Sequence, residues 1–120
     1  MPIKSAKQKG TKFEKLVYDK LKPYFPEILR VYGSGATKES KGDLITNKYL
    51  FELKHHKSIS DKEMNDWFNK LKEQAEEKLK LPVLVFRTHR SPIKVMMNHN
   101  FLDTNFRVVA LLDDWLKGLK

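Results

Sequence analysis

Hydrophobic residues recur along this chain with two different spacings, and the spacing predicts which segments are helices and which are strands. Residues 11–22 and 60–80 carry them at helical intervals of three and four. Short runs rich in apolar residues instead predict strands. These runs are 28–32, 43–46, 49–54, 82–86, 93–97 and 106–111, with a short closing helix at 113–119. The order predicts an α/β fold with a mixed central sheet flanked by helices.

The first predicted helix begins at Thr11 and ends just before Pro23, since proline cannot continue a helix. Thr11 with Glu14 three residues later has the pattern of a capping box, in which each side chain binds the other's backbone amide. Residues 1–10 are polar and rich in lysine, so we expect a flexible basic arm there and a single domain over 11–120. The apolar face of the helix consists of Phe13, Leu16, Val17 and Leu21, with Phe25 packing from the following turn.

A second capping box, Ser60 with Glu63, opens the longest predicted helix, which runs to about Leu79 or Lys80. Trp67 lies in its apolar stripe. An indole could stack on a nucleic-acid base, but this spacing favours packing in the core. The stripe consists of Met64, Trp67, Phe68, Leu71, Ala75 and Leu79.

The strands on either side of Asn47-Lys48 are predicted to form a hairpin, because asparagine tolerates the left-handed geometry of a tight turn. A two-residue turn sets Asp43 directly opposite Glu52. Since side chains alternate along a strand, the two faces of the hairpin then differ in character. One face carries Asp43, Glu52, Lys54 and His56, and the other carries Leu44, Phe51, Leu53 and His55.

Two carboxylates that face each other on neighbouring strands repel, so a sheet built only for stability should avoid the pair. Mg²⁺ or Mn²⁺ reverses that repulsion, because these cations bind carboxylate, carbonyl and water oxygens. A bound ion lowers the pKa of its water and neutralises charge that develops on a phosphate. Lys54 can orient that water or stabilise the developing charge, and the backbone carbonyl of Leu53 is a further candidate ligand.

These residues therefore predict a metal-dependent nuclease centre. The alternative is that Glu52 and Lys54 form the solvent face of a strand and that Asp43 is a turn residue. The joint geometry, the preceding loop with Gly33, Gly35 and Gly42, and the local basic charge favour the metal site.

Charge and composition narrow the function classes. The net charge is +9 and the pI is about 9.7, which points to a polyanionic partner such as nucleic acid. Lysines concentrate near the N-terminus and around the proposed site, so phosphate binding explains them better than general solubility. The absence of cysteine excludes disulfides and thiolate zinc sites. No apolar run is long enough to span a bilayer and no signal peptide is visible, so we expect a cytoplasmic protein with no membrane partner.

The order of the motifs also resembles a known family. The chain carries a helix with Glu14, then Gly42-Asp43, then Glu52-Leu53-Lys54 in an apolar strand. This order resembles the PD-(D/E)XK nuclease superfamily, with Gly42 where the name has proline. The run 30–35 leading into 41–43 most resembles the archaeal Holliday junction resolvases and related phage or viral endonucleases. The similarity spans roughly residues 11–87 and implies a restriction-endonuclease-like core of order α-β-β-β-α-β.

The resemblance implies roles at the centre. Asp43 and Glu52 would bind Mg²⁺, for which Mn²⁺ could substitute, together with the Leu53 carbonyl. Lys54 would be the catalytic lysine. Glu14 would face the metal from the first helix, unless it serves instead as a capping partner.

Further residues are implied around it. Ser34 would lie near the scissile phosphate, and Arg30 would precede the loop as a basic residue. The expected nucleic-acid-binding residues are Lys9, Lys12, Arg30, Ser34, Lys38, Lys41, His56 and Lys57.

Histidines raise a zinc alternative. His55 and His56, with His89 and His99, could supply ligands, but adjacent histidines on a strand point to opposite faces and chelate poorly. We instead expect His56 on the active face, contacting phosphate, and His55 packed or solvent-exposed.

The leading hypothesis is a Mg²⁺-dependent endonuclease that hydrolyses DNA phosphodiesters in branched DNA such as four-way junctions. Paired cuts imply a homodimer with two sites related by a two-fold axis, and exposed apolar residues such as Phe101, Phe106 and Trp115 would form its surface. One alternative is a nicking or restriction-like nuclease on duplex DNA. Another is a non-catalytic basic module, whose binding would depend steeply on salt and not on metal.

Overall fold

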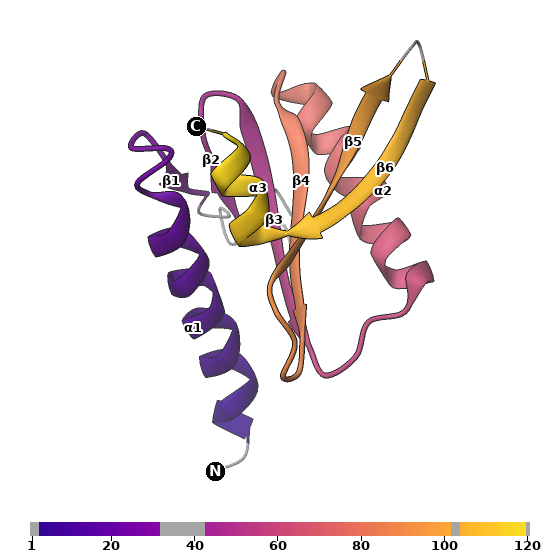
Figure 1. Ribbon diagram of the computed structural model, residues 1–120. Coiled ribbons are helices and arrows are strands. Elements are labelled where there is room, and N and C mark those ends of the chain that lie inside the picture. The colour runs from indigo at the N-terminus through magenta and orange to yellow at the C-terminus, as the bar shows by residue number, and fades with distance from the viewer. Residues whose placement is uncertain (1–2, 32–42, 102–103, 120) are drawn as a thin grey trace.

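The computed structural model describes residues 3–31, 43–101 and 104–119, with side chains left undescribed for 3–11, 99–101 and 104–106. It forms one mixed sheet with three helices (Figure 1). The elements are α1 (Ile3–Leu21), β1 (Leu29–Arg30), β2 (Leu44–Ile45), β3 (Tyr49–His56), α2 (Asp61–Glu77), β4 (Leu81–Thr88), β5 (Lys94–Phe101), β6 (Thr104–Leu111) and α3 (Leu112–Gly118). The predicted order α-β-β-β-α-β is confirmed.

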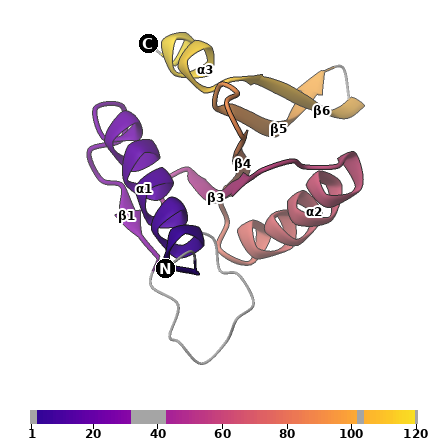
Figure 2. The ribbon, with the colours of Figure 1, turned by 90° about the horizontal axis from the view of Figure 1, so that it is seen from below.

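The six strands lie in the order β1-β2-β3-β4-β5-β6, and β3 and β4 form the one parallel pair among them. Helices α1 and α3 pack against one face of the sheet and α2 packs against the other (Figure 2). Each face therefore has its own apolar cluster, with Phe51 on the α1 side and Leu50 on the α2 side. No helix in the described part of the chain combines the length and hydropathy required for a transmembrane span.

Helix α1 begins eight residues earlier than predicted, at Ile3 and not at Thr11. Residues 3–10 are therefore helical rather than an arm without secondary structure. Lysine, alanine and glutamine favour helix, and a single interior glycine costs only about 1 kcal/mol. Because Thr11 lies inside the helix, it cannot act as an N-cap, and the predicted capping role of Glu14 is wrong.

The apolar face of α1 is mostly as predicted. Phe13, Val17 and Leu21 are buried, but Leu16 remains 38% exposed. Phe25 packs from the turn after the helix, as expected, into an aromatic cluster. The ring of Trp115 on α3 completes that cluster, 5.4 Å from Tyr49 and 6.1 Å from Phe51. Trp115 is therefore partly buried and not fully exposed as expected, and a dimer contact at this residue stays a prediction. The side chains of Phe101 and Phe106 lie outside the described residues.

Helix α2 begins as predicted, with a complete capping box. The Ser60 hydroxyl accepts from the Glu63 amide at 3.1 Å, and the Glu63 carboxylate accepts from the Ser60 amide at 3.0 Å. Its end was predicted two to three residues too late. Leu79, expected in the core stripe, is 91% exposed with φ of 59°. The left-handed residue reverses the chain so that β4 can start beside β3, where the Leu81 amide donates to the Lys48 carbonyl.

We expect Ser60→Ala to lower the free energy of unfolding by about 1 kcal/mol, because it leaves a helix amide without its acceptor. Urea denaturation of the variant measures the change. Ser58→Ala removes an exposed hydroxyl from the segment before the helix, outside the capping box, and should change stability much less. Equal losses in the two variants would contradict the capping role.

The hairpin register, on which the site prediction depended, is confirmed. Leu44 pairs with Phe51 and Ile45 with Leu50. The Thr46 hydroxyl stabilises the turn by accepting from the Tyr49 amide at 2.9 Å and from the Lys48 amide at 3.3 Å. A side-chain hydrogen bond of this kind fixes the turn, and the turn fixes which residues face each other.

Strand β4 runs parallel to β3, and its residues Val83, Leu84 and Val85 are fully buried, as their continuous apolar run predicted. Strands β5 and β6 are longer than predicted. The polar residues from Asn98 to Asn100 gave no strand signal, but they pair with β6 across a long hairpin. Cross-strand backbone pairing thus extends both strands beyond their apolar parts.

Candidate functional site

The candidate site lies at the start of β2, beside the middle of β3. The Asp43 amide donates to the Phe51 carbonyl at 2.7 Å, although Phe51 is the register partner of Leu44 and Asp43 precedes the first paired residue of β2. The Asp43 carboxylate Oδ2 accepts from the Leu53 amide at 2.7 Å. These two hydrogen bonds hold Asp43 beside β3, close enough to Glu52 for the charge of that residue to raise the pKa of Asp43. Glu52 is only 5% exposed.

The carboxylate of Asp43 lies in surroundings that disfavour its charge. Burial, the negative charge of Glu52 and that of Glu14 raise the pKa of Asp43 from 3.8 to about 6, although the Leu53 amide and the Lys54 cation oppose the rise. Desolvation is the largest cause, and the charge of Glu52 is the next. Functional sites commonly hold carboxylates at such a penalty, and a bound cation would offset it.

Lys54 extends over the same side of β3 as Glu52. Its Nζ lies 3.4 Å from Glu52 Oε2 and 5.0 Å from the centre of the Trp67 ring on α2. The imidazole of His56 stacks on the same indole at 5.1 Å, with 28° between the rings. The structure therefore brings Glu52, Lys54 and His56 together on one face, as the predicted alternation requires.

Trp67 is the residue that sequence reasoning assigned to the core and that the structure places at the edge of the site. It is partly buried, whereas its neighbour Phe68 is fully buried. Consecutive residues on a helix differ by about 100° in direction, so two adjacent aromatic residues cannot both point at the core. That adjacency is the signal that could have identified a flanking position for one of them.

Glu14 and Arg30 form an ion pair with each other, Glu14 Oε2 to Arg30 Nε, between α1 and β1. Both side chains line a hollow of about 380 Å³ together with Lys15, Tyr18 and Asp19. Glu14 is close enough for its charge to raise the pKa of Asp43. The helix thus brings Glu14 to the border of the site.

The remaining predicted residues are those expected to bind nucleic acid. Lys12 is exposed on α1 and Lys57 is exposed just after β3. Lys9 belongs to α1, but its side chain is not described. Ser34, Lys38 and Lys41 lie outside the described residues.

His55 and His56 lie on opposite faces of β3, as predicted. His55 faces α1, with its ring 5.0 Å from that of Phe13, and His56 faces α2. Among the residues that the structure describes, no group of three His, Asp or Glu side chains is close enough to hold a metal ion. His55, His56 and His89 therefore form no zinc cluster.

The donors that are present fit Mg²⁺ better than zinc. Mg²⁺ binds through one or two carboxylates and keeps several waters, so it does not need three protein ligands. Asp43 and Glu52 supply two carboxylates whose mutual repulsion contributes to the raised pKa of Asp43, and a cation would offset that repulsion. The chemistry of the donor set thus suits a hard divalent cation, with Glu14 available at the border.

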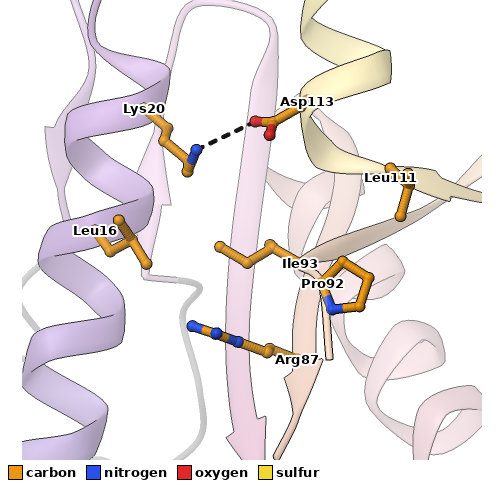
Figure 3. A pocket seen from close by; sticks show the side chains of 7 residues that line it. All are labelled: Leu16, Lys20, Arg87, Pro92, Ile93, Leu111 and Asp113. Carbon is orange, nitrogen blue, oxygen red and sulfur yellow. Dashed lines mark hydrogen bonds and ion pairs between the residues drawn. The ribbon is translucent and has the colours of Figure 1, made fainter. Parts of the chain in front are cut away.

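A second hollow, of about 270 Å³, lies between α1, α3 and the connection from β4 to β5 (Figure 3). An ion pair of 3.2 Å between Lys20 and Asp113 crosses its upper end. Its lining consists of Leu16, Lys20, Arg87, Pro92, Ile93, Leu111 and Asp113. None of these belongs to the candidate site, so the hollow is separate from it.

Comparisons with known proteins bear on the fold and the family of this chain. The solved structure of Hjc from Archaeoglobus fulgidus, described as a Holliday junction resolvase from an archaeal hyperthermophile, matches with a TM-score of 0.57. The match covers 88% of this chain and 98% of that one at 15% identity, so the likeness concerns the fold. No curated protein matches the chain. The model of the family described as "Phage putative PDDEXK endonuclease" matches residues 5–110, and the chain therefore belongs to this endonuclease family.

Proposed function

We propose that this protein is a Mg²⁺-dependent endodeoxyribonuclease that selects branched DNA such as four-way junctions and acts as a homodimer. The observation that carries the proposal is the pair of neighbouring carboxylates Asp43 and Glu52, with a raised Asp43 pKa and the Lys54 ammonium 3.4 Å from Glu52. Membership of an endonuclease family supports the reaction class.

Each residue has a role in this proposal. Asp43 and Glu52 hold the cation, with the Leu53 carbonyl as a further ligand and Glu14 joining directly or through water. When bound, the cation supplies an acidified water and neutralises charge on the scissile phosphate. Lys54 orients that water or donates to the phosphate oxygens as negative charge develops.

The surrounding basic residues position the DNA. Lys12 is exposed on α1 and Lys57 is exposed just after β3, and a DNA phosphate can accept from either. Arg30 and His56 supply further donors beside them, and Lys9, Ser34, Lys38 and Lys41 complete the proposed contact set. Arg30 would exchange its contact with Glu14 for a phosphate as the DNA arrives.

Selectivity for junctions is supported by likeness to known nucleases. The Hjc structure of similar fold is described as a Holliday junction resolvase, and the resemblance in the run 30–35 points the same way. Resolution requires two cuts related by symmetry, which a homodimer provides. A nuclease that nicks or cuts plain duplex is the alternative within the same chemistry.

The test uses a labelled four-way junction and a linear duplex of the same sequence, each with Mg²⁺, Mn²⁺, Ca²⁺ or EDTA. We expect cleavage with Mg²⁺ or Mn²⁺ to exceed that in EDTA on the order of a thousandfold or more. Faster cutting of the junction, with paired cuts by a dimer in sedimentation, supports the full proposal.

Equal cutting of both substrates would replace the junction proposal with the duplex nuclease. Salt-sensitive binding without cleavage in any metal, by a folded sample, would leave only a nucleic-acid-binding module and refute the enzyme.

A further inference from the structure

Trp67 is placed between the core and the candidate site. It packs at the border of the apolar cluster under α2, beside Met64, while Phe68 takes the fully buried position. Its ring therefore covers polar side chains of β3. Those side chains are Lys54 and His56, which are two residues apart and so lie on the same face of the strand.

The indole contacts both of them. The Lys54 ammonium lies 5.0 Å from the ring centre, within the range of a cation–π interaction, which is strongest with tryptophan. The stacked imidazole of His56 restricts the plane of the indole from the strand side. The ring is thus held by the core on one side and by β3 on the other.

Lysine needs such support at a catalytic centre. Its ammonium sits on a flexible four-carbon stem, and its side chain here is 27% exposed. The contact with Glu52 at 3.4 Å gives one restraint. A cation bound by Glu52, however, draws the same carboxylate, so this restraint weakens when the site is loaded. The indole is neutral and binds no Mg²⁺, so its hold on the ammonium persists.

We propose that Trp67 is a positioning residue that holds the Lys54 ammonium in place through the face of its indole, and that His56 keeps this ring in its plane. The proposal rests on the proposed nuclease function, and it adds a residue from α2 that the sequence motif does not contain. Direct stacking of Trp67 on a DNA base is the competing role.

The first test separates chemistry from binding. We expect Trp67→Leu to lower the single-turnover cleavage rate at saturating DNA about tenfold while the Kd for DNA in Ca²⁺ changes less than about twofold. Trp67→Phe, which retains a weaker aromatic face, should recover part of the rate. Met64→Ala is the matched control, because Met64 packs against the same cluster one helical turn before Trp67, whereas the ring over Lys54 belongs to Trp67.

Each other outcome refutes the positioning role. If Trp67→Leu weakens DNA affinity but leaves the cleavage rate unchanged, Trp67 stacks on a base and does not position Lys54. A loss of similar size in Met64→Ala, or a cleavage rate in Trp67→Leu that equals that of the native protein, removes the special contribution of the ring.

The second test needs no activity. Metal-free protein is treated with an amine-acylating reagent, and mass spectrometry measures modification of Lys54 relative to exposed Lys57. We expect the relative rate at Lys54 to rise about threefold in Trp67→Leu and less in Trp67→Phe. An unchanged rate would overturn the contact even if the nuclease proposal holds. A raised rate in a protein that never cuts DNA would uphold the contact and reject the nuclease.

Discussion

Asp43→Asn is expected to abolish metal-dependent cleavage and, in the same protein, to raise the stability of the metal-free fold. Asparagine keeps an oxygen that can accept from the Leu53 amide, the 2.7 Å contact that fixes this side chain. It removes the negative charge that a cation needs and that burial and Glu52 disfavour. We expect the cleavage rate to fall on the order of a thousandfold.

The stability effect has a definite pH dependence. Because the pKa of Asp43 is about 6 in the folded protein and 3.8 is its ordinary value, the folded state binds this proton more tightly than the unfolded state. Well below about pH 4 Asp43 is protonated in both states, so it does not lower the free energy of unfolding. As the pH rises from about 4 to about 6, its ionisation lowers that free energy progressively, and above about pH 6 the loss is complete. At about pH 8 the cost reaches about 3 kcal/mol, since each tenfold difference in proton affinity between the two states corresponds to about 1.4 kcal/mol.

Thermal unfolding in EDTA measures this cost. At about pH 8 the variant should melt on the order of 10 °C above the native protein, and the gap should close toward about pH 4. Added Mg²⁺ should stabilise the native protein and leave the variant unchanged. Asp19→Asn is the control, because Asp19 is an exposed carboxylate paired with Lys15 and should show no such gain. A variant that is less stable than the native protein under the alkaline condition, or that still cuts DNA, would contradict the site.

Lys54→Met should give the second large effect. Methionine retains a flexible apolar stem that can pack on Trp67, but it removes the ammonium beside Glu52. We expect the single-turnover rate to fall at least about a hundredfold, because no fixed cation then stabilises the developing charge. DNA affinity in Ca²⁺ should fall far less, since one phosphate contact is a small part of the total.

Lys57→Met provides the matched comparison a short distance along the chain. Lys57 is exposed beyond the end of β3 and is proposed to bind DNA phosphate. Its loss should weaken DNA binding and reduce the slope of log K against log salt concentration by about one. The cleavage rate at saturating DNA should stay near that of the native protein. If both variants lose rate equally, or neither does, the distinct role of Lys54 is refuted.

Much of the fold is encoded locally. The order of elements followed from apolar spacing, and the start of α2 followed from the Ser60 capping box. The pairing of β2 with β3 followed from a short turn between two apolar runs, and Thr46 stabilises that turn through its own hydroxyl. These features succeed because their causes lie within a few residues of one another in the chain.

Other boundaries depend on partners that are distant in sequence. The start of α1 at Ile3 is an exception, because the lysine, alanine and glutamine residues of that segment favour helix by themselves. Leu79 leaves the core stripe because the chain must reverse to bring β4 alongside β3. Polar residues at the far end of β5 join a strand because β6 pairs with them.

The candidate site divides in the same way. Local sequence is enough to bring Asp43 near Glu52 and to set Lys54 on the same side of β3 as Glu52, because one turn and the alternation of a strand govern those positions. The pairing of Glu14 with Arg30 and the cover that Trp67 provides over Lys54 depend instead on tertiary packing. Those contacts join a helix to a strand, and their geometry is set by how whole elements pack on the sheet, which no local pattern of residues specifies.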